Sequence, residues 1–249
     1  MKVAISVGGR FHAFDMARQL HRRKYLAQLI TSYPKSKVGE WGIPRGLVRT
    51  VLSHEFLSRG WRLLARRLGW RSDPQFDFND RYDRIAARRL LAGADITVAW
   101  SGMALQTLRV AQELGSWAVL ERNSSHIQYQ SDLMKEEYER LGWEPRLPDR
   151  RMIERELAEY EAADAICVPS TFACRSFVQR GVAADKLMMV PFGVSIEQFQ
   201  PLAVEESPFR IIFCGALSIR KGLHYLLQAF QELDLPDAEL WLVGPPTAE

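Results

Sequence analysis

The sequence lacks several features that would assign it quickly to a class. Its 249 residues contain neither glycine fingerprint for nucleotide phosphates, G-x-G-x-x-G or G-x-x-x-x-G-K-[ST], which counts against an ordinary dinucleotide-binding or P-loop protein. No apolar run approaches the roughly 18 residues of a membrane-spanning helix. The chain enters an apolar, strand-like run directly after its first residues, so we expect no signal peptide.

Cysteine is scarce and the charges nearly balance. The three cysteines, Cys167, Cys174 and Cys214, lack metal-ligand spacing, and two lie in predicted core strands. We therefore expect reduced packing thiols, a cytoplasmic protein and no bound metal. A formal net charge of +3 is too small to indicate a nucleic-acid partner by itself, and a hydrophobic fraction of 47% is typical of a globular chain with a core.

Short apolar runs alternate with amphipathic segments along most of the chain. Strands are predicted at residues 2–7, 26–31, 95–100, 117–121, 165–168 and 186–191. Helices are predicted at residues 14–23, 45–70, 81–91, 103–114, 131–141, 151–163 and 172–180. This alternation predicts an α/β fold with a doubly wound parallel sheet, covered by helices on both faces.

Residues 192–208 contain two prolines and an acidic pair and show no periodicity, which is typical of an interdomain linker. We predict a Rossmann-like domain over residues 1–195, a linker over 196–208, and part of a second Rossmann-like domain over 209–249. A doubly wound domain has about six strands, and only two are predicted here. We therefore expect a fragment that ends within its second domain; the alternative is a half-domain that pairs with another chain.

The most informative segment is FCGALSIRKG at residues 213–222. It joins an apolar strand, residues 209–213, which we expect to be buried on both faces, to an amphipathic helix at 223–233. Ser218 is placed to cap that helix. The N-terminus of a helix attracts anions, and the adjacent cations Arg220 and Lys221 strengthen that attraction. The segment predicts a phosphate site; the alternative is a solvated charged pair.

Several motifs follow one another in a fixed order. They are ELAEYEAADAICVPS at 156–170, Phe172, Ser176-Phe177, Gly181-Val182, Lys186, VPFGV at 190–194, Phe199 with Pro201, and GALSIRKG at 215–222. In this order and spacing they resemble the retaining glycosyltransferases of family 4, which are nucleotide-sugar-dependent enzymes of the GT-B architecture. The resemblance covers the whole layout and is sharp between residues 121 and 222.

The resemblance implies a function and a fold. It implies one complete acceptor-side domain, the start of a donor-binding domain, and transfer of a sugar from a nucleoside-diphosphate sugar to an acceptor hydroxyl with retention. The co-substrate is the nucleotide sugar, and no metal or other cofactor is implied. The acceptor would be a glycan or a lipid-linked molecule. The family's acidic pair, which contacts sugar and ribose, is expected beyond Glu249.

The resemblance also implies roles for particular residues. Arg220 and Lys221 would hold the donor diphosphate, beside Gly215 at the end of the preceding strand. When the glycosidic bond breaks, negative charge builds on the phosphate oxygens, and fixed cations stabilise that transition state. His126, in the loop after strand 117–121, would lie near the donor sugar and share this catalytic site.

Other candidates follow predicted strands, at the edge where open α/β sheets bind ligands. Gly8 and Gly9 would let the backbone approach a donor phosphate or an acceptor closely, or simply form a tight turn. Glu121 and Ser124 share the loop of His126 and would contact sugar or acceptor hydroxyls. Arg10 and His12 share the loop of Gly8 but receive no role.

Two further positions are candidates with a structural alternative. Ser170 follows strand 165–168 and is placed to cap the next helix. Gly193 lies in the PFGV turn and would contact sugar or acceptor at the cleft. For both, an architectural role is the alternative.

Residues 35–71 are strongly basic. They hold nine cations against Glu40 and Glu55. The cations are Lys35, Lys37, Arg45, Arg49, Arg59, Arg62, Arg66, Arg67 and Arg71. Apolar residues at helical spacing form one stripe: Leu57, Trp61, Leu64 and Leu68. Residues 45–71 therefore predict either a peripheral contact with the anionic inner face of a membrane or a core-facing stripe with a solvated basic side.

Two alternative functions stay open at this point. The nearer one is another GT-B enzyme, such as a sugar-nucleotide epimerase or an inverting transferase. The more distant one is a non-catalytic module that binds a glycan or a membrane surface.

Overall fold

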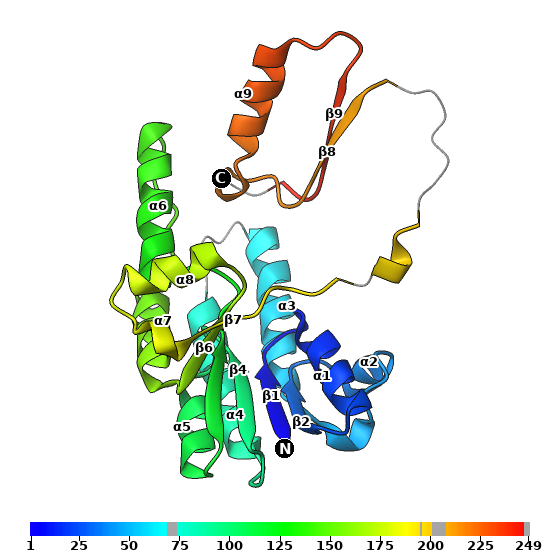
Figure 1. Ribbon diagram of the computed structural model, residues 1–249, viewed down its shortest axis with the longest axis vertical. Coiled ribbons are helices and arrows are strands. Elements are labelled where there is room, and N and C mark those ends of the chain that lie inside the picture. The colour runs from blue at the N-terminus through cyan, green and yellow to red at the C-terminus, as the bar shows by residue number, and fades with distance from the viewer. Residues whose placement is uncertain (69–73, 195, 201–207, 247–249) are drawn as a thin grey trace. The chain divides into compact units, whose positions relative to one another are not determined.

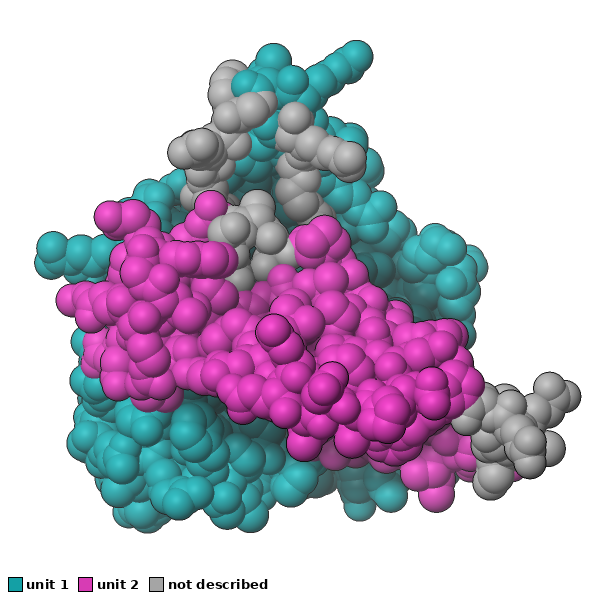
Figure 2. Space-filling model, turned by 90° about the horizontal axis from the view of Figure 1, so that it is seen from above, with its two compact units in different colours: residues 1–129, 148–191 teal, residues 130–147, 192–249 magenta. Residues whose placement is uncertain are grey.

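The computed structural model describes residues 1–68, 74–194, 196–200 and 208–246 (Figure 1). The chain divides into two compact units, coloured separately in Figure 2. Unit 1 comprises residues 1–129 and 148–191, and unit 2 comprises residues 130–147 and 192–249. Residues 130–147, which the sequence assigns to the first domain, thus group with the second unit. Most of the predicted linker, residues 201–207, lies outside the described residues.

Unit 1 contains a seven-stranded sheet in the order β3-β2-β1-β4-β5-β6-β7, and every strand pair in it is parallel. The strands are β1 (Val3–Val7), β2 (Leu26–Thr31), β3 (Val48–Thr50), β4 (Ile96–Trp100), β5 (Trp117–Glu121), β6 (Ala165–Val168) and β7 (Leu187–Met189). The parallel α/β fold predicted from the alternation is confirmed.

Helices separate the strands. In unit 1 and across the boundary with unit 2 they are α1 (Ala13–Arg22), α2 (Lys35–Gly39), α3 (Leu52–Leu68), α4 (Gln75–Arg89), α5 (Leu105–Glu113), α6 (Ile127–Arg140), α7 (Arg150–Ala162) and α8 (Thr171–Val178). Short 3-10 turns are η1 (Arg45–Leu47), η2 (Ala184–Lys186) and η3 (Ile196–Gln198). The predicted cap of α8 is confirmed, because Ser170 Oγ accepts a hydrogen bond of 3.2 Å from the Ala173 N–H.

Unit 2 contains a two-stranded parallel sheet of β8 (Arg210–Cys214) and β9 (Glu239–Val243), joined through η4 (Ile219–Lys221) and α9 (Leu223–Leu233). The prediction that residues 209–213 are buried on both faces is wrong. Phe209 is 62% exposed and Ile212 59% exposed. Two strands and one helix have too little surface to cover both faces of their own sheet. Cys214 on β8 is exposed for the same reason.

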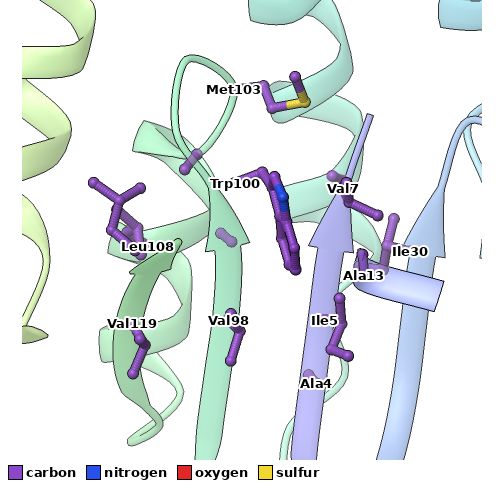
Figure 3. Packing of buried hydrophobic residues seen from close by; sticks show 14 of the residues in the cluster. Ala4, Ile5, Val7, Ala13, Ile30, Val98, Trp100, Met103, Leu108 and Val119 are labelled. Carbon is purple, nitrogen blue, oxygen red and sulfur yellow. The ribbon is translucent and has the colours of Figure 1, made fainter. Parts of the chain in front are cut away.

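The core of unit 1 lies between the sheet and its helices. All five residues of β1 are buried, as expected for an inner strand of a parallel sheet. Figure 3 shows side chains from β1, β4 and β5 packed along the strands, with the Trp100 ring between β4 and β1. Phe14 and Leu108 on the covering helices are fully buried. This packing holds the strand ends, and the loops after them, in fixed positions.

One predicted helix is partly wrong. Residues 45–70 were expected to be helical throughout, but η1 and the edge strand β3 precede α3. The three residues of β3 are too few to show a strand period. The part of this prediction at residues 69–70 lies outside the described residues. No helix in the described part of the chain is long and apolar enough to cross a membrane.

Candidate functional site

The strand order of unit 1 defines where a ligand is expected. The chain passes from β1 through β2 to β3 at one edge of the sheet, then returns to place β4 on the other side of β1. In open parallel sheets, ligands bind at the carboxyl ends of the strands beside such a reversal. Gly8 and Gly9 follow β1, and Glu121 ends β5. Because all these strands are parallel, the sheet brings these predicted residues to one edge, which we call the carboxyl edge.

The two glycines are packed tightly where they leave β1. The Gly8 N–H lies 3.0 Å from Met103 Sδ, and the Gly8 carbonyl accepts a 3.0 Å hydrogen bond from Ser32 Oγ. A Cβ on Gly8 would lie 2.5 Å from Met103 Sδ, and one on Gly9 would lie 2.9 Å from the ring of Phe11. A side chain at either position would need Met103 or Phe11 to move, and its absence also suits a closely approaching ligand.

Glu121 is paired with a residue that the sequence left without a role. Its Oε1 lies 3.1 Å from His12 Nε2, although the two residues are 109 positions apart. The Glu121 side chain is buried, whereas that of His12 is 30% exposed. The His12 ring also lies against that of Trp100, with 5.1 Å between centroids. A buried carboxylate beside a partly exposed imidazole holds that imidazole in one orientation.

Glu121 also affects its neighbour on β6. Burial, and then the charge of Glu121, raise the pKa of the Cys167 thiol to about 12. A thiol with this pKa stays protonated at neutral pH and is a poor nucleophile. This agrees with the expected packing role of Cys167.

His126 is buried rather than placed in a surface loop. It is 2% exposed and packs against the rings of Tyr160 and Phe177, at centroid distances of 5.0 and 5.1 Å. Burial, together with the positive charges of Arg180 and Arg122, lowers the pKa of His126 to about 4. The imidazole is therefore neutral at pH 7. Its predicted contact with the donor sugar stays a prediction.

This pKa predicts a pH-dependent contribution to stability. An unfolded histidine has a pKa of about 6.5, so the folded protein binds fewer protons than the unfolded chain between pH 4 and 6.5. The contribution is complete above pH 6.5 and is lost as the pH falls toward 4. We expect His126→Phe to be more stable relative to wild type at pH 4.5 than at pH 7.5, by up to about 3 kcal/mol.

Denaturant unfolding of both proteins at the two pH values measures this difference. His21→Gln, a change of a histidine on the surface of α1, serves as the control and should leave the pH dependence unchanged. A constant difference between wild type and His126→Phe across the pH range would contradict the assignment.

Buried charges on α7 hold the loops at the carboxyl edge. Glu156 Oε2 lies 2.7 Å from Arg122 Nη1 and accepts a 2.8 Å hydrogen bond from the Tyr160 hydroxyl. One helical turn further, Glu159 accepts hydrogen bonds from the N–H groups of Gly102 and Ala104, at 2.6 and 2.8 Å. α7 thus fixes the loops after β4 and β5. The sequence places Glu156 within the family motif but gives it no role.

The remaining predicted residues belong to unit 2. Arg220 and Lys221 occupy η4, after β8 and directly before α9. Both side chains are exposed, and neither forms an ion pair or hydrogen bond with the part of the chain that the structure describes. Gly222 has a φ of 69°, in the left-handed region that favours glycine, and begins α9. The cations therefore stand at the N-terminus of an eleven-residue helix.

Three further residues named in the sequence analysis are Ser218, Gly215 and Gly193. Ser218 does not cap a helix with its side chain; it lies before η4, and its carbonyl accepts from the Lys221 N–H at 3.1 Å. The backbone at Gly215 is approached closely by Gly244, where a Cβ would lie 1.8 Å from the Gly215 oxygen, so this approach requires glycine at position 244. Gly193 is exposed, with nothing within 4 Å of a Cβ built on it, so no packing contact explains this glycine.

Metal chemistry has no obvious ligands here. Among the residues that the structure describes, no group of three or more His, Cys, Asp and Glu side chains is arranged to hold an ion.

Ser124 is half-buried in the loop between Glu121 and His126, which places a hydroxyl at the carboxyl edge beside the predicted sites.

Comparison with known proteins defines the class of fold. No family model matches the chain, and no curated protein matches it. Solved structures do match over its whole length, and the likeness shows an α/β fold of the GT-B type, with Rossmann-like units.

Three of these structures are informative. HepE from Anabaena, in complex with UDP and glucose, aligns with all of this chain at 14% identity and a TM-score of 0.57. The lipopolysaccharide outer core galactosyltransferase WaaB aligns with all of it at 13% identity and a TM-score of 0.52. A putative UDP-N-acetylglucosamine 2-epimerase from Listeria monocytogenes aligns with 97% of it at 12% identity and a TM-score of 0.50. The chain spans 62% of the length of each.

Proposed function

We propose that this chain belongs to a nucleotide-sugar-dependent glycosyltransferase that transfers a sugar to an acceptor hydroxyl. The observation that carries the proposal is the exposed pair Arg220 and Lys221 before α9, in a chain with a GT-B fold. A departing diphosphate needs compensating positive charge, and two cations at a helix N-terminus supply it. The match to WaaB, a galactosyltransferase, and to HepE with bound UDP supports the same reading.

We further propose retention of configuration without a metal ion, as in the family that the motifs resemble. The bond from the anomeric carbon to the phosphate oxygen breaks, and a bond from that carbon to the acceptor oxygen forms on the same face. The proton of the acceptor hydroxyl passes to the departing phosphate oxygen. Arg220 and Lys221 take the charge-neutralising role that a metal has in other transferases. The free cysteines and the nucleotide-sugar donor support a cytoplasmic location within this proposal.

A sugar-nucleotide epimerase is the second candidate, and the likeness to the Listeria structure favours it. The two functions differ in their products. A transferase yields a glycosylated acceptor whose anomeric configuration NMR can read. An epimerase converts its nucleotide sugar without any acceptor.

Calorimetric titration with nucleoside diphosphates tests the donor site, starting with UDP because HepE binds it. We expect saturable binding by the wild-type chain and loss of binding in an Arg220→Ala, Lys221→Ala double variant. The matched control is Arg146→Ala, which removes an exposed cation from the same unit. Absence of binding to every nucleotide by a folded wild-type chain, or equal binding by the double variant, would contradict the proposed site.

A further inference from the structure

A cationic cavity lies at the β3 edge of unit 1, apart from the predicted catalytic residues. Its volume is about 540 Å³, and its lining comes from α2, β3 and the facing ends of α3 and α4. The lining residues are Lys35, Arg49, Thr50, Val51, Leu52, Ser53, Ile85 and Arg89. Three cations and two hydroxyls thus face one space, and no carboxylate lines it.

No carboxylate among the described residues neutralises the charges of this cavity. Arg49 Nη1 donates to the Gly46 carbonyl at 3.0 Å, and Arg89 Nη1 donates to the Thr50 carbonyl. These contacts orient the guanidinium groups and use only some of their N–H donors. None of the three cations pairs with a carboxylate in the described part of the chain. Such a set of oriented, uncompensated donors suits a phosphate group.

The cavity continues into an exposed apolar helix face. Leu52 lines the cavity and is the first residue of α3. Phe56 and Leu63 lie on the same side of that helix at positions four and eleven residues further on. They are 73% and 72% exposed. In Figure 1, α3 extends past the carboxyl ends of the strands of its own unit, which leaves this face uncovered by that sheet.

Side chains on other sides of α3 are exposed as well. Leu64 and Leu68 are 52% and 54% exposed. Among the cations, Arg67 is exposed, and Arg59 is exposed but pairs with Glu55 at 2.5 Å. The core-facing stripe that the sequence allowed is therefore wrong for Leu64 and Leu68. The side chains of Arg62 and Arg66, and all of Arg71, lie outside the described residues.

We propose that the cavity and the α3 face form a docking site for an anionic phospholipid at a membrane surface. The headgroup phosphate binds Lys35, Arg49 and Arg89, while Phe56 and Leu63 enter the boundary with the acyl chains. Basic residues beside large apolar ones are typical of helices that lie in this interface. A second copy of the chain fits less well, because it would bring these cations against their own counterparts. The proposal goes beyond sugar transfer and does not depend on it.

Vesicle co-sedimentation, without any nucleotide sugar, tests the proposal. We expect wild-type protein to bind vesicles that contain phosphatidylglycerol and to bind pure phosphatidylcholine vesicles weakly. Replacing Lys35, Arg49 and Arg89 by glutamine should lower the affinity for the anionic vesicles on the order of a hundredfold, at about fivefold per cation. The variant Phe56→Ser, Leu63→Ser should also lower it, while keeping binding of glycerol phosphate in solution.

A charge-matched control separates the cavity from general positive charge. It replaces Arg23, Arg109 and Arg175, three exposed cations of unit 1 outside the cavity, and should retain binding. Thermal unfolding verifies that every variant is folded. Equal binding by the two triple variants would overturn the proposal. So would glycerol phosphate binding without vesicle binding, or a concentration-dependent dimer that Phe56→Ser, Leu63→Ser abolishes.

Discussion

Replacing Lys221 by methionine is expected to lower kcat of the proposed sugar transfer on the order of a hundredfold or more, and Arg220→Met should have a comparable effect. Both cations are exposed at the start of α9 and have no partner in the described part of the chain. Their charge is therefore available to the diphosphate of the proposed donor. Because negative charge on the phosphate grows as the glycosidic bond breaks, kcat should fall more than the affinity for the donor.

Steady-state kinetics with the donor identified by calorimetry measures this effect. Arg146→Met is the matched control, since it removes an exposed cation of the same unit, and its kcat should stay within about twofold of wild type. Lys221→Arg should recover part of the activity, because it restores the charge in a different shape. Wild-type kcat in both methionine variants would refute the role in leaving-group stabilisation.

Most of the sheet could be predicted from the sequence because its inner strands are largely buried. Residues 26–31, 117–121 and 165–168 were predicted with the bounds that the structure has. Each consists mainly of apolar or β-branched residues between polar turns, and such runs stand out where a parallel sheet is covered on both faces. β3 was missed because it has three residues, and the N-terminal part of α4 was missed because its residues 75–80 are mostly polar.

Of the candidate site, only residues at or just after the ends of predicted strands could be predicted from the sequence. Gly8, Gly9 and Ser124 were predicted because each follows a predicted strand, and Glu121 was predicted because it ends one. The contact of His12 with Glu121 depends on the strand order, which places β1 and β5 on either side of β4. The sequence shows that His12 is a polar residue shortly after β1. It does not show which strands are neighbours, so the contact with Glu121 could not be predicted.

The burial of polar residues could not be predicted from the sequence either. His126 is neutral and enclosed because aromatic rings from α7 and α8 cover it. A single sequence shows that these helices exist but not which way their side chains turn. The exposure of α3 has the same origin. Its apolar residues have the spacing of a core-facing stripe, and only the path of the helix leaves them uncovered.

Glu159 is an ionisable residue that is fully buried, and its replacement gives the largest expected loss of stability. Glu159 is 0% exposed, accepts two backbone hydrogen bonds from the loop after β4, and lies 3.3 Å from Arg155 Nε. Glu159→Leu leaves the N–H groups of Gly102 and Ala104 without an acceptor and removes one partner of a buried guanidinium. We expect the free energy of unfolding to fall by about 3–5 kcal/mol. Denaturant unfolding measures it.

The matched control is Glu154→Leu, an exposed position five residues earlier on α7, which should cost less than about 0.5 kcal/mol. Burial raises the pKa of Glu159 to about 7. The folded protein therefore binds more protons than the unfolded chain between pH 4.5 and 7, and this contribution is lost as the pH rises through 7. The deficit of Glu159→Leu should consequently be larger at pH 5 than at pH 8. A deficit equal to that of Glu154→Leu would show that the loop after β4 is held without Glu159.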